Sequence, residues 1–265
     1  MKHQPTPPIA VEELTRRQQQ VLAAVQEQGF VTIEALARQF DVSAQTVRRD
    51  IITLEKAHFL QRFHGGAGLR DSSVRLGYAQ KQVIAVEGKE RIGQAVADLI
   101  PDGASVFLDV GSTVEAVARA LLDKRGLQIF TCSAAVAMLF TEHPNIEVFL
   151  TGGLLRGANG SLVGNVTVEQ ISLFKVDFSV VSFAGFDSDG TPMDFDLQKI
   201  AVRQAGLDHS RHAVAVVDSS KFDCTAVMRL APLSAFQTLV TDAEPPEHLR
   251  RAFGEAGVAC VVAGA

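Results

Sequence analysis

The pattern of hydrophobic and polar residues between positions 31 and 54 predicts two short helices separated by a sharp turn. Thr32 is a good N-cap for a first helix that runs through Phe40, and Ser43 is a good N-cap for the second helix. Apolar residues recur at helical spacing in both segments and give each helix one buried stripe. The stripes consist of Ile33, Leu36, Ala37 and Phe40 in the first helix and Val47, Ile51 and Leu54 in the second.

The opposite face of the second helix carries side chains that suit a DNA groove. This face holds Gln45, Thr46, Arg48 and Arg49. Glutamine pairs with adenine edges, arginine pairs with guanine edges or phosphates, and a helix N-terminus favours a phosphate. A solvated amphipathic helix would explain the two arginines alone, so the flanking segments decide between the two interpretations.

The flanking segments complete a three-helix unit with a wing. Upstream, Thr15 to Gln18 fits a capping box at the start of a further amphipathic helix. Downstream, Phe59 to Phe63 alternates like a strand, and Gly65-Gly66 is a strong turn signal before a returning strand. We therefore predict a winged helix-turn-helix over residues 14–70. Its expected DNA contacts are Thr32, Ser43, Gln45, Thr46, Arg48, Arg49, Arg62 and His64.

Charge supports a DNA interface at one end of the chain. Residues 1–70 hold nine Lys/Arg against seven Asp/Glu, a net of +2, while the whole chain of 265 residues has a net charge of −5. The attraction to DNA is therefore confined to this end. The length and the 47% hydrophobic content fit one small and one large domain.

The remainder of the chain predicts a tail, a connection and a large α/β domain. Residues 1–13 are expected to form a disordered tail and residues 71–88 a linker and connecting segment, followed by a helix that ends near Ile100. Short apolar runs then alternate with helix-like stretches, which favours a mainly parallel sheet between helices over residues 89–265. The expected strands are Ser105 to Asp109, Leu127 to Thr131, Ile146 to Thr151, Phe178 to Phe183, Ala213 to Val217 and Thr238 to Thr241.

Polar residues follow four of these strands, where such sheets bind ligands. The positions are Val110 to Thr113, Cys132-Ser133, Gly152-Gly153 and Asp218 to Phe222. A glycine and two hydroxyls before a helix suit an anion, and Lys221 is a plausible counter-charge. Helix capping, a simple turn or a surface lysine would explain each feature separately. Together they indicate a phosphate site.

Three cysteines, Cys132, Cys224 and Cys260, are widely spaced and form no CxxC pair. They support neither a disulfide framework nor a zinc site, and we expect buried thiols in a reducing cytosol. No apolar run approaches the ~20 residues that cross a bilayer, and the N-terminus lacks the apolar core of a secretory signal. We therefore expect a cytoplasmic protein with no membrane partner, no metal and no cofactor.

Several motifs of this chain occur together in one known family. They are Ser43 to Asp50, His64 to Ala67, Lys89 to Ile92, Leu108 to Thr113, Gly152-Gly153, Gly164 and Asp218 to Phe222. From about Thr15 to the C-terminus, the chain resembles the DeoR family of bacterial transcriptional repressors. Four further segments are most similar to members that respond to sn-glycerol 3-phosphate: Ser72 to Val74, Asp187 to Gly190, Phe195-Asp196 and Thr241 to Pro246.

The resemblance implies a winged helix joined to a sensor domain that is similar to sugar-phosphate isomerases. It implies a repressor that binds operator DNA as a homodimer or homotetramer and is released by a phosphorylated sugar or polyol, here sn-glycerol 3-phosphate. Gly111, Ser112 and Thr113 would hold the phosphate, and Lys221 would neutralise its charge. The other expected ligand contacts are Asp109, Thr131, Cys132, Gly152, Gly153 and Asp196.

The chain departs from the family pattern at positions that bear on the ligand. The family's Thr-Asn is Thr131-Cys132 here, which exchanges an amide for a weakly donating thiol. After Asp196, where the family tends to have a glutamate, this chain has Gln198 and Lys199. Both changes bear on which ligand is preferred.

Two other functions stay open at this stage. An isomerase-like enzyme fused to a DNA-binding arm would use Asp109, Asp196 and Lys221 as a base and a charge stabiliser, although the sequence contains no metal motif or nucleophile elbow. Alternatively, the large domain only forms oligomers and senses nothing.

Overall fold

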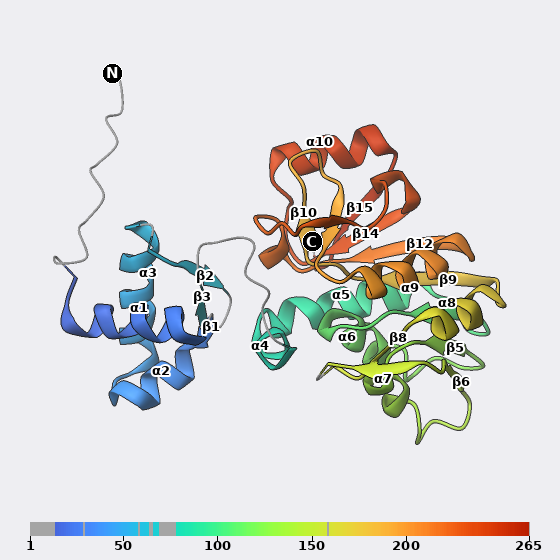
Figure 1. The fold of residues 1–265 in the computed structure, drawn as a ribbon, viewed down its shortest axis with the longest axis horizontal. Coiled ribbons are helices and arrows are strands. Elements are labelled where there is room, and N and C mark those ends of the chain that lie inside the picture. The colour runs from blue at the N-terminus through green and yellow to red at the C-terminus, as the bar shows by residue number, and fades with distance from the viewer. Residues whose placement is uncertain are drawn as a thin grey trace. The chain divides into compact units, whose positions relative to one another are not determined.

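The computed structural model describes residues 14–28, 30–57, 59–63, 66–68, 78–157 and 159–264. The chain divides into two compact units, which we call the winged-helix unit (Met1–Ala85) and the sheet domain (Val86–Ala265). Figure 1 shows the elements of both units. The predicted tail, residues 1–13, and residues 71–77 of the predicted linker lie outside the described residues. Within the described ranges, no helix has the length and apolar character to cross a membrane.

The winged-helix unit packs three helices against a small antiparallel sheet whose strand order is β1-β3-β2. The core of the unit joins the apolar stripes of the three helices, including Val21, Val25, Leu36, Val47 and Ile51. Its elements are α1 (Arg16–Gln28), β1 (Phe30–Thr32), α2 (Ile33–Phe40), α3 (Ala44–Lys56), β2 (Gln61–Phe63), β3 (Gly66–Gly68) and α4 (Tyr78–Val83).

The predicted caps of the three helices are confirmed. The Thr15 backbone N–H donates to Gln18 Oε1 at 3.0 Å, and the Gln18 N–H donates to Thr15 Oγ1 at 3.3 Å, which is the reciprocal capping box. Thr32 and Ser43 each accept the N–H of the residue three positions on, both at 3.1 Å. Between α2 and α3, Asp41 adopts a left-handed conformation with φ of 52°, and this closes the turn.

The sheet domain is built on seven parallel strands in the order β15-β14-β12-β9-β4-β5-β6. All six predicted strands are present, and β15 is an additional strand at one edge. The strands are β4 (Ser105–Leu108), β5 (Gln128–Thr131), β6 (Glu147–Leu150), β9 (Val176–Val181), β12 (Ser210–Val216), β14 (Thr238–Thr241) and β15 (Ala259–Val262).

Helices cover both faces of this sheet (Figure 1). Successive residues of a strand point to opposite faces, so Val106 and Leu108 pack under one helical layer while Phe107 packs under the other. The first layer contains α5 (Val86–Leu99), α6 (Ser112–Ala120) and α7 (Ala134–Leu139). The second contains α8 (Asn165–Ser172), α9 (Leu197–Asp208) and α10 (Glu247–Ala256).

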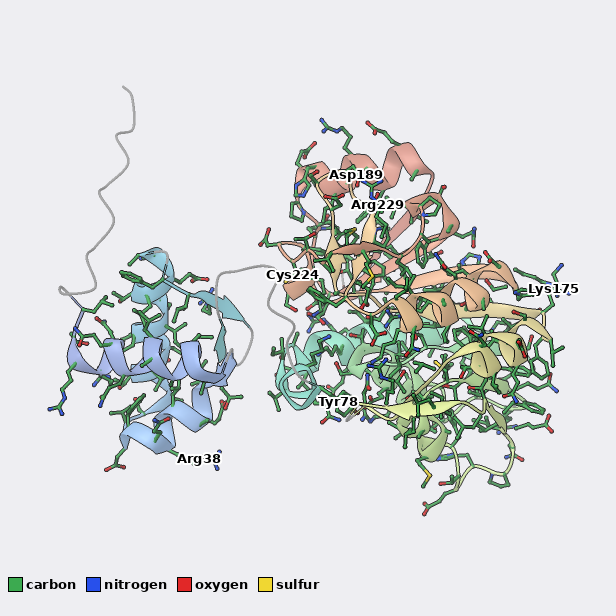
Figure 2. The ribbon with its side chains drawn as sticks, in the orientation of Figure 1. Arg38, Tyr78, Lys175, Asp189, Cys224 and Arg229 are labelled. Carbon is green, nitrogen blue, oxygen red and sulfur yellow. The ribbon has the colours of Figure 1, made fainter. Side chains whose placement is uncertain are left out.

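Two small antiparallel sheets were not predicted from the sequence, because their strands have only two or three residues. One is the hairpin of β7 (Leu154–Arg156) and β8 (Ser161–Val163). The other combines β10 (Gly185–Phe186), β11 (Pro192–Asp194) and β13 (Met228–Arg229), with the short 3₁₀ helices η2 (Ser219–Lys221) and η3 (Leu233–Ala235) nearby in sequence. At this small sheet, Asp189 and Arg229 lie together in Figure 2 and form an ion pair of 3.4 Å.

The expectation of three buried thiols is wrong for two of the cysteines. Cys132 is buried, but Cys224 is only half-buried and Cys260 is exposed. Cys260 lies on β15, which is an edge strand of the sheet, and an edge strand has fewer neighbours to cover it. All three cysteines are free thiols.

Candidate DNA interface and candidate ligand site

The exposed face of α3 carries the side chains expected to contact DNA. Gln45, Arg48 and Arg49 are exposed and Thr46 is half-buried, while Val47, on the opposite face, is fully buried. No other described residue lies within ion-pair distance of Arg48 or Arg49. Two exposed guanidinium groups on α3 that have no ion-pair partner within the described part of the chain are available for phosphates or base edges.

The hydroxyl groups of Thr32 and Ser43 hold the starts of α2 and α3. Each accepts a backbone hydrogen bond as an N-cap, and Ser43 Oγ also lies 2.8 Å from Thr46 Oγ1. A role in DNA contact would therefore come in addition to a structural role. DNA contact stays a prediction for Thr32, Ser43 and Thr46.

Glu55 positions the wing residue Arg62. The Arg62 backbone N–H donates to Glu55 Oε1 at 3.2 Å, and the Arg62 Nε lies 3.6 Å from Glu55 Oε2. Both side chains remain accessible, so a DNA phosphate could compete for the guanidinium. The second predicted wing contact, His64, lies outside the described residues.

An ion pair that sequence reasoning missed joins α1 to α3. Arg17 Nε donates to Asp50 Oδ2 at 2.5 Å, and Gln18 Nε2 donates to Asp50 Oδ1 at 3.4 Å. Asp50 is buried, and it falls on the same helical stripe as Val47 and Leu54. An acidic residue on an apolar stripe was the available signal for this pair, because a buried carboxylate needs a partner.

The candidate ligand site lies at the carboxyl end of the sheet, where the chain order of the strands reverses between β4 and β9. In open α/β sheets, ligands bind at such switch points. Gly111 precedes α6 there with φ of 142° and ψ of 157°, a conformation almost restricted to glycine. Among the described residues, no side chain caps α6, and none would lie within 4 Å of a Cβ at Gly111. The start of this helix therefore has space for an anion.

Asp109 forms a buried cluster with two residues that the sequence did not indicate. Arg203 Nε donates to Asp109 Oδ2 at 2.6 Å, and the same guanidinium donates to Asp194 Oδ2 at 2.6 Å. Burial lowers the pKa of Arg203, but the two carboxylates outweigh it and raise that pKa above its ordinary value. Arg203 is therefore charged, and it fixes the carboxylate that the sequence predicted as a ligand contact.

Two further predicted contacts face inward: Thr131, the last residue of β5, and Cys132, the residue that follows it. The Thr131 hydroxyl donates to the Leu108 carbonyl at 2.7 Å and accepts the Ser133 N–H at 3.0 Å, which joins β5 to β4. The Cys132 Sγ lies 4.0 Å from Asp109 Oδ1. Burial raises the pKa of Cys132 far above the usual range of a thiol. Cys132 is thus a neutral side chain beside the Asp109 carboxylate.

A buried lysine that was not predicted as a ligand contact, Lys89 on α5, lies beside the loop that carries Lys221. Its Nζ is 3.8 Å from Asp218 Oδ2, and its side chain is 6% exposed. Burial lowers the pKa of Lys89, the Asp218 carboxylate opposes this shift, and the Lys221 charge adds to it. The charge of Glu115, in the first turn of α6, also raises the pKa of Lys89. The Lys221 charge therefore acts on Lys89, which is paired with Asp218 of the same loop.

The two glycines after β6 pack against α8. The Gly152 N–H donates to Gln170 Oε1 at 2.6 Å, and the Thr167 hydroxyl donates to the Gly152 carbonyl at 2.7 Å. A Cβ at Gly153 would lie 2.1 Å from Thr167 Oγ1, so only glycine fits there. This close approach of α8 explains Gly153 without a ligand.

The start of α9 is tied to the β7–β8 hairpin. Asp196 is the N-cap of α9 and accepts the backbone N–H groups of Gln198 and Lys199. Arg156 donates to Gln198 Oε1 at 2.5 Å, and Lys199 Nζ donates to Asn159 Oδ1 at 3.4 Å. The two residues that replace the family's glutamate therefore hold the hairpin over this end of the sheet.

Comparisons with known proteins agree with this organisation. A DeoR-like helix-turn-helix domain matches residues 17–73, and the DeoR C terminal sensor domain matches residues 84–243. The glycerol-3-phosphate regulon repressor of Escherichia coli (strain K12) is 38% identical over 88% of this chain and 92% of its own length. The transcriptional repressor CsqR of the same organism is 38% identical over 91% of this chain and 94% of its own.

Among solved structures, ribose 5 phosphate isomerase A from Neisseria gonorrhoeae aligns with 54% of this chain and 55% of its own, at 14% identity and a TM-score of 0.38. The two domain models together span both units, and the relatives match nearly end to end. The chain belongs to the DeoR family of transcriptional regulators.

Proposed function

We propose that this protein is a transcriptional repressor that leaves its operator when the sheet domain binds a phosphorylated polyol or sugar. The proposed inducer is sn-glycerol 3-phosphate, because a relative with 38% identity is named for the glycerol-3-phosphate regulon. The observation that carries the sensor role is the uncapped start of α6 at Gly111, at the switch point of the sheet.

The phosphate would bind at the start of α6. The first backbone N–H groups of a helix have no partner within the helix, and they favour an anion. Ser112 and Thr113 would add hydroxyl donors, while Lys89 and Lys221 would supply positive charge. Burial lowers the pKa of Lys89, and a phosphate bound nearby would raise that pKa again, because an opposite charge favours the ammonium form.

The polyol end of the ligand would face Asp109 and Cys132. Asp109, Asp194 and Arg203 carry a formal charge of −1 together, so this end disfavours a phosphate and suits hydroxyl groups that donate to a carboxylate. The neutral Cys132 beside Asp109 offers fewer hydrogen bonds than an amide would. We therefore propose that Cys132 affects which polyol or sugar is preferred.

An isomerase-like enzyme is the less well supported function. A general base must accept a proton from the substrate, and a base whose carboxylate is already held by a guanidinium at 2.6 Å is a weaker acceptor. Asp196 is likewise engaged as a helix cap. The same groups are sufficient for binding without turnover.

We also propose that the repressor acts as a homodimer or homotetramer. Helix-turn-helix proteins bind paired half-sites, and the symmetry of the operator then mirrors that of the protein. The DNA partner would place the protein in the cytoplasm.

The test is a DNA-binding assay with the region upstream of the protein's own gene, titrated separately with sn-glycerol 3-phosphate, fructose 1-phosphate and inorganic phosphate. Selective release by sn-glycerol 3-phosphate is the expected result. Release by fructose 1-phosphate alone would keep the repressor and replace the inducer. No release by any of the three compounds would contradict the proposed sensor role.

Three variants separate the two proposed sites. Arg48→Ala is expected to abolish operator binding and leave ligand binding intact, whereas Lys221→Ala is expected to stay on DNA when inducer is added. Arg250→Ala is the matched control, because it removes one exposed positive charge from α10, a helix that carries none of the proposed site residues. If Lys221→Ala were released at the wild-type inducer concentration, the proposed phosphate site would be wrong.

A further inference from the structure

Ala85, the residue at which the winged-helix unit ends, has an unfavourable backbone conformation. The sheet domain begins at the next residue, with the first turn of α5. Ala85 is buried and has φ of 50°, in the left-handed region that alanine rarely adopts. Among the described residues, Asp41 is the only other non-glycine residue with positive φ, and aspartate can form local hydrogen bonds there that alanine lacks. The surroundings of Ala85 must therefore hold its conformation.

The first turn of α5 is in close contact with the residue that follows β14. A Cβ at Gly88 would lie 2.1 Å from Asp242 Oδ2, so a side chain at this position would displace the Asp242 carboxylate. The same carboxylate holds the start of η2, because Asp242 Oδ1 accepts the Ser219 N–H at 2.6 Å. η2 also carries Lys221, the proposed counter-charge of the phosphate. A movement of η2 on ligand binding would therefore reach Gly88 through one carboxylate.

A second connection between η2 and α5 runs through Lys89. Lys89 Nζ lies 3.8 Å from Oδ2 of Asp218, the residue that caps η2. This distance is longer than a hydrogen bond, so a phosphate bound at Lys221 would compete with Asp218 for the ammonium group of Lys89. Lys89 follows Ala85 by about one helical turn. Both connections thus end in the turn that begins directly after Ala85.

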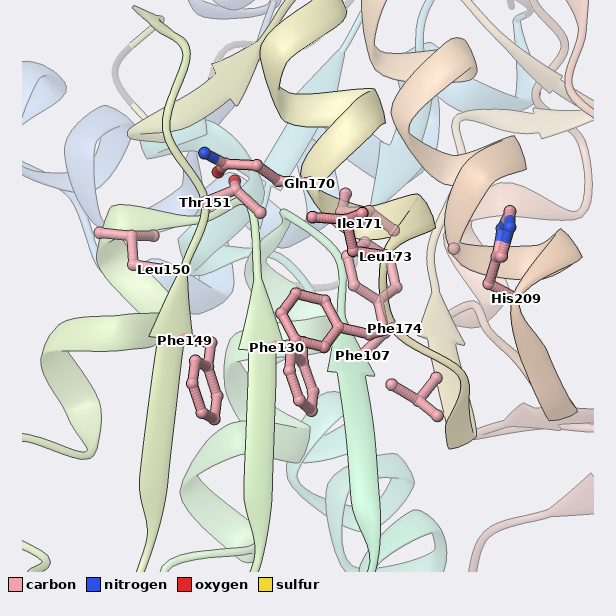
Figure 3. A pocket seen from close by; sticks show the side chains of 12 residues that line it. Phe107, Phe130, Phe149, Leu150, Thr151, Gln170, Ile171, Leu173, Phe174 and His209 are labelled. Atoms are coloured by element: carbon pink, nitrogen blue, oxygen red, sulfur yellow. The ribbon is translucent and has the colours of Figure 1, made fainter.

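The cavity on the opposite face of the sheet is separate from these contacts. Figure 3 shows this apolar cavity, whose walls include the rings of Phe107, Phe130, Phe149 and Phe174. Of the described residues that line it, none belongs to α5, α6 or η2. The contacts that connect the proposed phosphate site to Ala85 therefore lie on the α5 face of the sheet.

We propose that Ala85 is the joint through which the inducer controls operator binding, and that its φ changes from positive to negative, or the reverse, between the operator-binding and released forms. This inference rests on the proposed function. A costly conformation at the border of two units persists only while its surroundings enforce it, and such residues occur in switch regions. A small change in the first turn of α5 can therefore alter the balance between the two forms. A change in φ redirects the chain where it enters α5.

Substitutions of Ala85 test the joint because they change the cost of the left-handed conformation at a residue outside both proposed sites. Glycine adopts positive φ readily, whereas a β-branched valine strongly disfavours it. Ala85→Gly therefore favours the form with positive φ, and Ala85→Val favours the other form. We expect the affinity for sn-glycerol 3-phosphate, measured by calorimetry on the full-length protein without DNA, to change by about two- to tenfold in Ala85→Gly. It should change in the opposite direction in Ala85→Val.

A second measurement on Ala85→Gly tests the joint even if Ala85→Val fails to fold. At saturating inducer the ligand site is full, so operator affinity reports the balance between the two forms. This affinity should differ from that of the wild type by about the same factor as the inducer affinity. A variant whose ligand site was only distorted would reach wild-type operator affinity once saturated, and that result would overturn the proposal.

Ala256→Gly is the matched control. It makes the same exchange at the last residue of α10, where φ is not positive, and it should bind inducer and operator as the wild type does. Wild-type inducer affinity in both Ala85→Gly and Ala85→Val would show that Ala85 is not the joint, while the proposed function would stand. Failure of sn-glycerol 3-phosphate, fructose 1-phosphate and inorganic phosphate to release the wild-type protein from its operator would instead contradict the proposed function, and the joint with it.

Discussion

At the residue scale, the charge of Arg203 determines whether Asp109 and Asp194 can stay buried as carboxylates. Arg203 contacts both at 2.6 Å and is 5% exposed. Removing one partner of a buried ion pair leaves an uncompensated charge, which typically costs about 3–5 kcal/mol. Arg203→Leu should therefore lower the free energy of unfolding of the sheet domain by about that amount, as measured by urea denaturation followed by circular dichroism.

The loss in Arg203→Leu should depend on pH. Burial raises the pKa of Asp109 even with Arg203 present, and removal of the guanidinium should raise it further. A carboxyl group whose folded pKa exceeds its unfolded value contributes most stability when protonated, and this contribution is lost as pH rises through the folded pKa. The destabilisation should thus be smaller at pH 5 than at pH 8. If Arg203→Leu lowered the free energy of unfolding equally at pH 5 and pH 8, the proposed effect of Arg203 on the pKa of Asp109 would be contradicted. Arg229→Leu, which breaks an exposed ion pair, is the control.

Single residues were predicted from the sequence where local chemistry determines their role. Thr32 and Ser43 were identified because an N-cap depends on the next three residues. Arg203 and Lys89 were missed as site residues, because their partners Asp109 and Asp218 are distant in the sequence and only the folded sheet brings them together. The neighbouring residues in the sequence do not distinguish a helical arginine or lysine that forms a buried ion pair from one that is exposed to solvent.

At the element scale, two glycines with similar φ angles, Gly111 (142°) and Gly153 (134°), should respond differently to substitution. Gly111 starts α6 in open space, whereas Gly153 is in close contact with Thr167 of α8. An alanine at Gly111 costs backbone strain of about 1–3 kcal/mol and places a methyl group where the phosphate would bind. An alanine at Gly153 adds a steric clash to that strain.

We therefore expect Gly111→Ala to abolish the thermal stabilisation by sn-glycerol 3-phosphate with a moderate loss of stability. Gly153→Ala should unfold at a lower temperature than Gly111→Ala while keeping its response to ligand. The measurement is a melting curve of each variant with and without ligand. Gly164→Ala is a useful comparison, because Gly164 also starts an uncapped helix with positive φ and open space around it. An unchanged ligand response in Gly111→Ala would refute the role of the α6 start.

Elements with a full period of hydrophobic residues were predictable from the sequence, and shorter ones were not. The stripes of α2 and α3 and the apolar runs of the central strands repeat often enough to identify their type. The hairpin strands β7 and β8 have three residues each, which is too short for alternation to be recognised. Their pairing nevertheless places Asn159 next to Lys199, so the unpredicted elements affect the candidate site.

At the scale of the whole molecule, a repressor of the proposed kind must couple a DNA interface in the winged-helix unit to a ligand site in the sheet domain. The predicted surfaces lie in separate units, Arg48 in one and Gly111 in the other. Coupling between two sites is a free energy that both ligands share, typically about 1–3 kcal/mol, or roughly 5- to 150-fold in affinity.

This shared free energy makes a reciprocal prediction. If sn-glycerol 3-phosphate weakens operator binding by a given factor, operator DNA must weaken sn-glycerol 3-phosphate binding by the same factor. Calorimetric titration of the inducer into the full-length protein, with and without saturating operator, measures one factor, and operator titrations at fixed inducer concentrations measure the other. In Arg48→Ala, the DNA should no longer change the affinity for the inducer. Inducer affinity that is independent of wild-type operator binding would mean that the sheet domain does not regulate the winged helix.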